Sequence, residues 1–349
     1  MKQFRSFVHK EFLHILRDGR TLLILLVMPL VLEINFGYAV STEVRGTMVA
    51  VSDAAHTPES RNIVKAIDAN RYFTVDTVMS HCDDPAHLLQ GGKVDVVVMI
   101  TADEDYQILA DGSEPNQAQM RAMYLQQIIM SNMAGMQLLA PRVRFLYNPQ
   151  QLSEYNFVPG IIGMIIILIC ALITSVSIVR EKEMGTMEVL LASPLKPITI
   201  ILAKLVPYFI VSTVNLVTII LLAHFAMGVP VAGSIVAFAI LSVLYIFVSL
   251  ALGLLISCAV SSQLAAMLLS VLLFVPTVYL SGMIFPIESL PPALQRPTNV
   301  VPATWYIDGA RRLLIQGVPV QYLVKDFAVL ALQAVVLVFV SFKLFKKRL

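Results

Sequence analysis

Most of the chain consists of long apolar runs that are separated by short polar stretches. About 20 apolar residues in a helix cross the hydrocarbon core of a bilayer, and the runs are close to that length. The pattern therefore predicts an α-helical polytopic membrane protein with about six transmembrane helices. The expected spans are residues 21–40, 157–179, 198–225, 231–257, 264–285 and 326–349, of which the last ends in a basic tail.

Residues 1–20 have a different pattern, in which aromatic and aliphatic side chains recur at helical spacing between basic ones. Such a segment is typical of an amphipathic helix that lies in the membrane interface. A cleavable signal peptide is the alternative, with residues 21–40 as its apolar core. That run is longer than the apolar region of a signal peptide and lacks a clear small-residue cleavage pattern, so we expect a permanent first span.

Residues 41–156 have the pattern of a soluble domain, because short β-like runs alternate with helical and turn-rich pieces. About a hundred residues are enough to enclose one core, so we expect an inserted extracytoplasmic α/β domain with a small mixed sheet. A row of methionines between residues 120 and 136 suits either that core or an adaptable binding face, and the core is the commoner use. The expected strands are 48–51, 73–78, 94–100 and 106–110, and the expected helices are 58–69 and 115–139.

Residues 286–325 are rich in proline and contain Trp305 and Tyr306. The segment is too polar to span a bilayer and too apolar for a free loop. It therefore predicts a partly re-entrant external hairpin with an aromatic anchor at the interface.

Composition agrees with a membrane protein, since the chain is 57% hydrophobic and 14% charged, whereas soluble domains have about 25% charged residues. The net charge of +2 favours neither a nucleic-acid partner nor an acidic substrate. If the N-terminus is cytoplasmic, the inner segments hold 13 of the 25 Lys and Arg but only 5 of the 23 Asp and Glu. The positive-inside rule thus predicts that both termini are cytoplasmic and that the α/β domain is outside.

Familiar catalytic patterns are missing from the sequence. There is no G-x-x-x-x-G-K-[ST] phosphate loop, H-E-x-x-H or G-x-S-x-G, and the three cysteines offer no disulfide framework. One window holds five candidate metal ligands, but no second cluster accompanies it, and Asp84 before Pro85 is also an ordinary helix start. We therefore expect no catalytic residue and no metal site. The five candidates in this window are His81, Cys82, Asp83, Asp84 and His87.

Two charged residues lie within apolar runs. Glu33 is deep in the first one, where a carboxyl group needs a partner, water or a proton. Lys204 is near the start of the third and is expected to extend its amine to the interface. One expectation for Glu33 is a neutral carboxyl group that bonds a neighbouring hydroxyl.

The polar stretch between the second and third spans begins with charged residues and ends at Pro194. Counted as a helix from Arg180, it places Met184, Met187 and Leu190 on one face and most charges on the others. This layout is typical of a short helix that rests on a membrane or on a partner. The sequence of the stretch, R-E-K-E-x-G-T-x-E-x-L-L-x-S-P, resembles the cytoplasmic loop of ABC-2 type transporter permeases. In that family the loop carries a helix that contacts the ATPase subunit.

The resemblance extends over nearly the whole chain and is to the exporter subgroup with a large external domain after the first span. Glu33 departs from it, since that position is more often apolar in the family. If two permeases pair as in this family, we expect Glu33 to face their interface, on the substrate path, and to favour cationic amphipathic compounds, with the neutral carboxyl group as the alternative. The other segments that carry the resemblance are Lys10-Glu11-Phe12 with Arg17-Asp18, Phe36–Ala39, Asn148-Pro149, Asn156–Gly160, Ser281-Gly282, Phe285-Pro286, Leu290-Pro291 and Pro302–Thr304.

The resemblance implies a permease subunit in a bacterial inner membrane that pairs with a second permease copy or a homologous permease. ATP and Mg would bind to separate cytoplasmic ABC ATPase subunits, this chain would hold no cofactor, and a periplasmic adaptor protein is a further candidate partner. The resemblance places residues 180–197 as the coupling loop. Its expected coupling residues are Arg180, Glu181, Glu183, Met184, Gly185, Met187, Glu188, Leu190 and Pro194.

Two functions follow from the sequence. The first is the permease of an ATP-driven exporter of drugs or other amphipathic compounds. The alternative is a non-transporting membrane scaffold or sensor whose external domain binds a ligand or partner, although one span would suffice for that. Neither function makes this chain an enzyme.

Overall fold

The computed structural model describes residues 2–17, 19–39, 46–82, 84–90, 94–103, 105–110, 115–133, 148, 152–186 and 197–347. The chain forms two compact units, a helical one from Met1–Ser41 with Leu152–Leu349 and a smaller one from Thr42–Gln151. This confirms the predicted fold class of a helical membrane protein with an inserted α/β domain.

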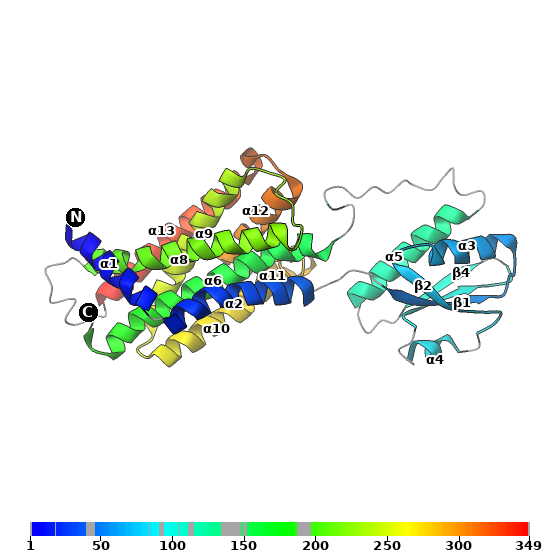
Figure 1. The fold of residues 1–349 in the computed structure, drawn as a ribbon, viewed down its shortest axis with the longest axis horizontal. Helices are drawn as coiled ribbons and strands as arrows, with labels where there is room; N and C mark the ends of the chain where they lie inside the picture. Colours follow the sequence, from blue (N-terminus) through cyan, green and yellow to red (C-terminus); the bar gives the residue numbers. More distant parts are fainter. Residues whose placement is uncertain are drawn as a thin grey trace. The chain divides into compact units, whose positions relative to one another are not determined.

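The helical unit is a bundle (Figure 1). Five helices in the described part of the chain are long and apolar enough to cross a membrane. Helix α2 was expected to be the first span. Its described residues contain an apolar stretch, Leu26–Asn35, that is shorter than a membrane span, so the first span stays a prediction. The bundle helices are α1 (Lys2–Arg17), α2 (Gly19–Ala39), α6 (Ser153–Glu183), α8 (Pro197–Phe225), α9 (Ile235–Ala259), α10 (Gln263–Leu280) and α13 (Val324–Lys347).

Helix boundaries follow local capping chemistry. The Ser234 hydroxyl accepts a hydrogen bond from the N–H of Ala237 at the start of α9, and the Ser262 hydroxyl accepts one from Ala265 at the start of α10. Each serine thereby satisfies a backbone donor that has no partner within the helix. With α9 ending at Ala259 and α10 beginning at Gln263, the connection between these helices is very short, as the uncharged sequence between them predicted.

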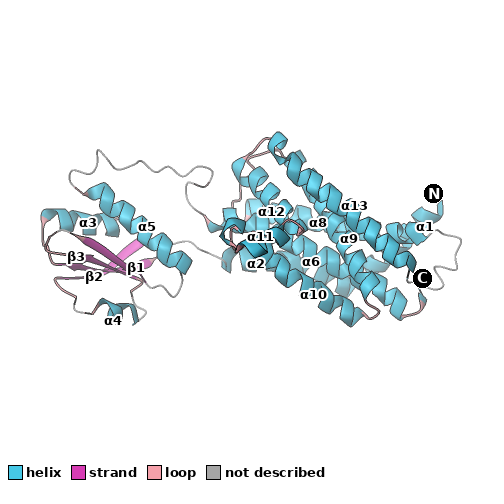
Figure 2. Cartoon of the chain, turned by 180° about the vertical axis from the view of Figure 1, so that it is seen from behind, coloured by secondary structure: helices cyan, strands magenta, loops and turns pink. Residues whose placement is uncertain are grey.

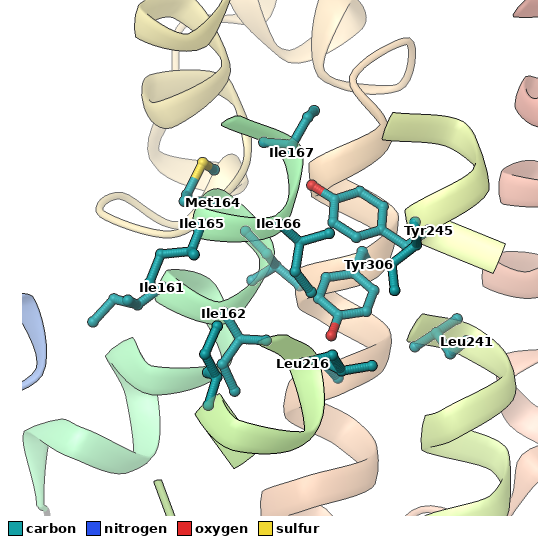
Figure 3. Packing of buried hydrophobic residues seen from close by; sticks show 14 of the residues in the cluster. Ile161, Ile162, Met164, Ile165, Ile166, Ile167, Leu216, Leu241, Tyr245 and Tyr306 are labelled. Carbon is teal, nitrogen blue, oxygen red and sulfur yellow. The ribbon is translucent and has the colours of Figure 1, made fainter. Parts of the chain in front are cut away.

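Helix α6 packs against α9, α10, α2, α12 and α8 and is the centre of the bundle. Its contact with α9 depends on Gly253, where an added Cβ would lie 2.7 Å from the carbonyl oxygen of Ala171. Such a distance is too short for any other residue, so the two backbones approach closely. Figure 3 shows the apolar side chains that α6 contributes to this core, among them Ile161, Ile162 and Ile166.

The segment expected to be an external hairpin contains η1 (Ile287–Ser289), α11 (Pro292–Thr298), α12 (Pro302–Arg311), the π-helical turn η2 (Arg312–Gln316) and η3 (Val320–Leu323). Helix α12 is buried against α6, α9 and α13. Tyr306 of α12 stacks on Tyr245 of α9 with ring centroids 4.2 Å apart (Figure 3). The Tyr245 hydroxyl donates a hydrogen bond to the carbonyl of Gly163 in α6. An added Cβ at Gly163 would lie 2.9 Å from the Tyr306 ring, so glycine is required there.

The smaller unit has a four-stranded sheet in the order β2-β1-β3-β4. Its strands are β1 (Thr47–Asp53), β2 (Phe73–Met79), β3 (Val96–Ile100) and β4 (Tyr106–Ala110), and its helices are α3 (Pro58–Asp68), α4 (Pro85–Gln90) and α5 (Pro115–Asn132). Strand β1 pairs in parallel with β2 and β3, while β3 and β4 are antiparallel, so the predicted mixed sheet is correct. Helices α3 and α5 cover one face and the short α4 lies on the other (Figure 2).

The methionine row and the helix start at Asp84 were both expected in this unit. Met120 and Met133 pack against the core, but Met123 and Met130 are exposed, so the methionine row is only partly a core feature. The side chain of Asp84 accepts hydrogen bonds from the N–H groups of Ala86 and His87, which confirms the helix start. Asp83 and residues 134–139 lie outside the described residues, and the compact unit ends at Gln151 rather than at residue 156 because α6 already begins at Ser153.

Candidate functional site

The last turn of α6 carries four consecutive charged residues, Arg180 to Glu183, and the last three of them each bond a different helix. Glu181 pairs with α8, Lys182 bonds the end of α9, and Glu183 bonds the start of α10. Successive residues of a helix point about 100° apart, so one turn reaches neighbours on several sides. We call Glu181, Lys182 and Glu183 the α6 hub. It lies at the end of the bundle where α1 begins and α13 ends (Figure 1).

Glu181 belongs to a buried ion network. The amine of Lys204 on α8 lies 2.8 Å from Oε1 of Glu181 and 3.4 Å from Oε2 of Glu11 on α1. The side chains of Lys204, Glu11 and Glu181 are 3%, 6% and 15% exposed. Lys204 is therefore not a lysine that extends to the interface, as expected from its position, but is enclosed because two carboxylates neutralise it from neighbouring helices. Buried charges of this kind need such pairing.

Lys182 and Glu183 interact with the ends of two helices. The amine of Lys182 donates to the carbonyl of Ser257, 2.6 Å away in the last turn of α9. Oε2 of Glu183 accepts hydrogen bonds from the backbone N–H and side-chain amide of Gln263, the first residue of α10, at 3.2 and 2.8 Å. A cation at a helix C-terminus and an anion at an N-terminus both match the helix dipole. The hub thus holds both sides of the short α9–α10 connection.

Helix α6 ends directly after the hub. Gly185 has a φ of +71° and nothing within 4 Å of where a Cβ would lie. A glycine in the left-handed conformation is a common helix stop. The expectation of one helix from Arg180 onward is therefore wrong, because Arg180 to Glu183 complete the long helix α6 and the chain turns at Gly185. The exposed Met184 lies at this turn, where its side chain is 66% exposed.

Glu33 lies elsewhere in the bundle. It is 0% exposed, and neither of its carboxylate oxygens has a hydrogen-bond partner among the described residues. The helices of its own chain enclose it, so none of its surface is left free for a second permease in this structure, and the role expected for Glu33 stays a prediction. The alternative of a bond to a neighbouring hydroxyl also finds no partner in the described part of the chain.

Comparison with known proteins connects this geometry to a family. The model of the ABC-2 family of transporter proteins matches residues 20–343. The chain belongs to this family. It is 28% identical to the probable multidrug ABC transporter permease YbhS of Escherichia coli strain K12, over 100% of this chain and 98% of the relative. It is also 28% identical to the probable multidrug ABC transporter permease YbhR of the same strain, over 89% of each chain, and 26% identical to ABC transporter G family member 20 of Dictyostelium discoideum, over 78% of this chain and 36% of the relative.

The expected coupling residues of this ABC-2 permease are only partly placed by the structure. Arg180, Met184 and Gly185 are exposed at the end of α6, whereas Glu181 turns inward to Lys204 and does not present its carboxylate to a partner as expected. Glu183 remains exposed but is engaged with Gln263. The other expected coupling residues, Met187, Glu188, Leu190 and Pro194, lie outside the described residues.

Sequence reasoning missed the partners of the hub. Glu11, Ser257 and Gln263 were not singled out, and Lys204 was assigned to the interface. The signal that could have found them was Glu11 itself, which interrupts the apolar face of an amphipathic helix between Val8 and Ile15. An acidic residue on such a face calls for a basic partner on a neighbouring helix, and Lys204 offers an amine within an otherwise apolar run.

Proposed function

We propose that this ABC-2 permease is the membrane subunit of an exporter that moves drug-like amphipathic compounds out of a bacterial cell. The observation that carries the proposal is its near full-length similarity to relatives whose names describe multidrug permeases. The sequence lacks a P-loop, so the proposal assigns ATP binding and hydrolysis to a separate cytoplasmic ATPase. The protein resides in the inner membrane with both termini in the cytoplasm and pairs with a second permease.

Coupling in this proposal runs through the end of α6. The ATPase contacts the exposed turn at Met184 and Gly185 and the stretch that follows, and displaces it during its cycle. The α6 hub then passes the displacement to α8 and α1 through Lys204, and to α9 and α10 through Ser257 and Gln263. The contacts of the hub with several helices support this role, because without them a displaced end of α6 would move and leave α8, α9 and α10 in place.

The scaffold alternative is less favoured. A receptor or sensor needs one span to anchor an external domain, whereas this chain has five candidate spans in its described part, packed around a central helix. A polytopic bundle of this kind suits a transport path. The α/β unit is proposed to receive cargo or to contact a periplasmic adaptor outside the membrane.

The coupling proposal is tested by a matched pair of glycine variants. Gly185 and Gly228 both have positive φ, at +71° and +68°, and neither has an atom within 4 Å of an added Cβ. Proline fixes φ near −65°, so both substitutions distort a turn to a similar extent. Gly228 lies in the α8–α9 connection, away from the hub.

We expect Gly185→Pro to weaken co-purification with the ATPase and to abolish cargo-stimulated ATP hydrolysis, while Gly228→Pro retains both. Glu188→Lys should act like Gly185→Pro, since it reverses a charge that is proposed to face the ATPase. The assays are co-purification from membranes and ATP hydrolysis across a panel of cationic and neutral compounds. Equal behaviour of the two proline variants would contradict the assignment of this turn as the transmission element.

A further inference from the structure

Glu33 is completely enclosed although it lies on a helix with an outward face. Its neighbours Val31 and Ile34 are 42% and 44% exposed, whereas Glu33 is 0% exposed. Leu30 and Leu32, on either side of Val31 in the sequence, pack against the main core. The carboxyl group therefore points into the bundle and not toward lipid.

The elements that pack closely against α2 are α1, α6 and α8. Glu154, in the first turn of α6, has one buried carboxylate oxygen without a hydrogen-bond partner among the described residues, but a second acidic group offers Glu33 no countercharge. The other charged groups of these helices that lie inside the bundle are engaged. Glu11, Lys204 and Glu181 bond one another, and Lys182 and Glu183 bond α9 and α10. Three uncharged titratable groups on α6 and α8 also have described partners. These pairs are Cys170 with Ser212, Tyr208 with Ser177, and His224 with the carbonyl of Val229.

An ionised carboxylate without a partner in such a place is very unfavourable, because it loses its hydration and gains nothing in return. A group in this position takes up a proton instead. A second permease copy cannot supply a countercharge, since no surface of Glu33 is left for it to contact. Protonation removes the charge and with it the largest part of this cost.

We propose that Glu33 is a proton-exchange site, which holds a carboxylic-acid proton while the bundle is closed and exchanges it for the positive charge of a cargo molecule. On opening, the carboxyl group becomes accessible while it still holds its proton. When a cationic cargo molecule binds, the O–H bond breaks, the proton passes to water, and the carboxylate pairs with the ammonium or phosphonium group of the cargo. When the cargo leaves, a proton from water restores the acid. This inference rests on the proposed export function and adds the exchanged ion and the class of cargo.

Carbodiimide chemistry tests the protonated state. A carboxylic acid adds across a carbodiimide C=N bond, so that its oxygen bonds the central carbon and its proton passes to nitrogen. Hydrophobic dicyclohexylcarbodiimide should label Glu33 in membrane vesicles that contain the full chain, its ATPase and ATP, and mass spectrometry of the peptide detects the product. A water-soluble carbodiimide should label the exposed Glu183 but not Glu33, which provides an internal control.

Cargo should compete with this reaction. We expect tetraphenylphosphonium to reduce the labelling of Glu33 and an uncharged amphipathic compound to leave it unchanged. Absence of labelling by the hydrophobic reagent, or labelling that tetraphenylphosphonium does not reduce, would overturn the proposal.

Variants provide a second measurement. Glu33→Gln keeps the shape and cannot ionise, so the ratio of cationic to neutral export should fall about tenfold or more, as expected for the loss of a charged hydrogen bond. Glu33→Asp should restore most of the ratio. An unchanged ratio in Glu33→Gln would overturn proton exchange, whereas failure of the wild type to export any compound would contradict the proposed function and leave the labelling result in place.

Discussion

Lys204→Met is the variant that tests the buried network most directly. The substitution retains most of the side-chain volume and removes the only cation between Glu11 and Glu181 that the structure describes in a buried position. Both carboxylates then remain largely buried, at 6% and 15% exposure, without their shared partner. Removal of one partner from a buried ion pair costs about 3–5 kcal/mol, so we expect the free energy of unfolding to fall by about that amount.

The distances also predict how the lost stability divides between the contacts of Lys204 with Glu181 and with Glu11. Attraction falls inversely with distance, so the 2.8 Å contact with Glu181 is about a fifth stronger than the 3.4 Å contact with Glu11. Double-mutant cycles of Lys204→Met with Glu181→Gln and with Glu11→Gln should therefore give the larger coupling energy for Glu181. The triple variant that neutralises all three residues should recover most of the stability, because replacement of a whole buried ion network is often close to neutral.

Unfolding of the purified permease in mixed micelles, followed by circular dichroism during a denaturant titration, measures these differences. Lys10→Met is the control, since Lys10 pairs with the same Glu11 at 3.3 Å but is 60% exposed. Exposed pairs contribute less than about 1 kcal/mol. A Lys204→Met protein as stable as the Lys10→Met protein, or a triple variant less stable than Lys204→Met, would refute the reasoning.

Three further predictions follow from the packing. Gly163→Ala should lower the free energy of unfolding by about 1–3 kcal/mol through overpacking against Tyr306. Gly19→Ala should not, because no atom lies within 4 Å of its added Cβ. Thermal unfolding compares the two variants, and equal midpoints would contradict the close approach of Gly163 to Tyr306. Glu183→Ala should cost about 1 kcal/mol through loss of the cap on α10, seen as faster hydrogen exchange at Gln263 and unchanged exchange in α8. Replacement of Thr42–Gln151 by a flexible linker should leave membrane insertion intact and impair export, and export at the wild-type rate would show that the α/β unit is dispensable.

The elements that the sequence predicted well are those with local causes. The apolar runs anticipated α8, α9, α10 and α13 within a few residues, since length and hydrophobicity are properties of one segment. Alternation of strand-like and helical pieces likewise anticipated the sheet. The end of α6 was also readable, because basic residues in a last helical turn followed by glycine are a common helix stop, but the helical count was continued through Gly185.

The contacts of the α6 hub and of Glu33 could not be predicted from local sequence. Glu11, Glu181 and Lys204 meet only because three helices pack together, and sequence spacing carries no information about that packing. The burial of Glu33 similarly depends on which side of α2 turns inward, and most residues around this position in the helix are apolar. Position along a span therefore predicted that these charges need partners, but not which partners they have.

Helix α6 has a mechanical property that its contacts alone do not reveal. Its 31 residues form a rod of about 46 Å, and its one internal proline, Pro159, lies near the end that follows the α/β unit. The remainder has an unbroken set of backbone hydrogen bonds, so it tilts as a stiff lever and does not bend in the middle. A small rotation at the hub then becomes a larger sideways displacement at the opposite end. Such coupling is reciprocal: if the proposed ATPase at the hub changes the affinity for a ligand at the far end by some factor, that ligand changes the affinity for the ATPase by the same factor.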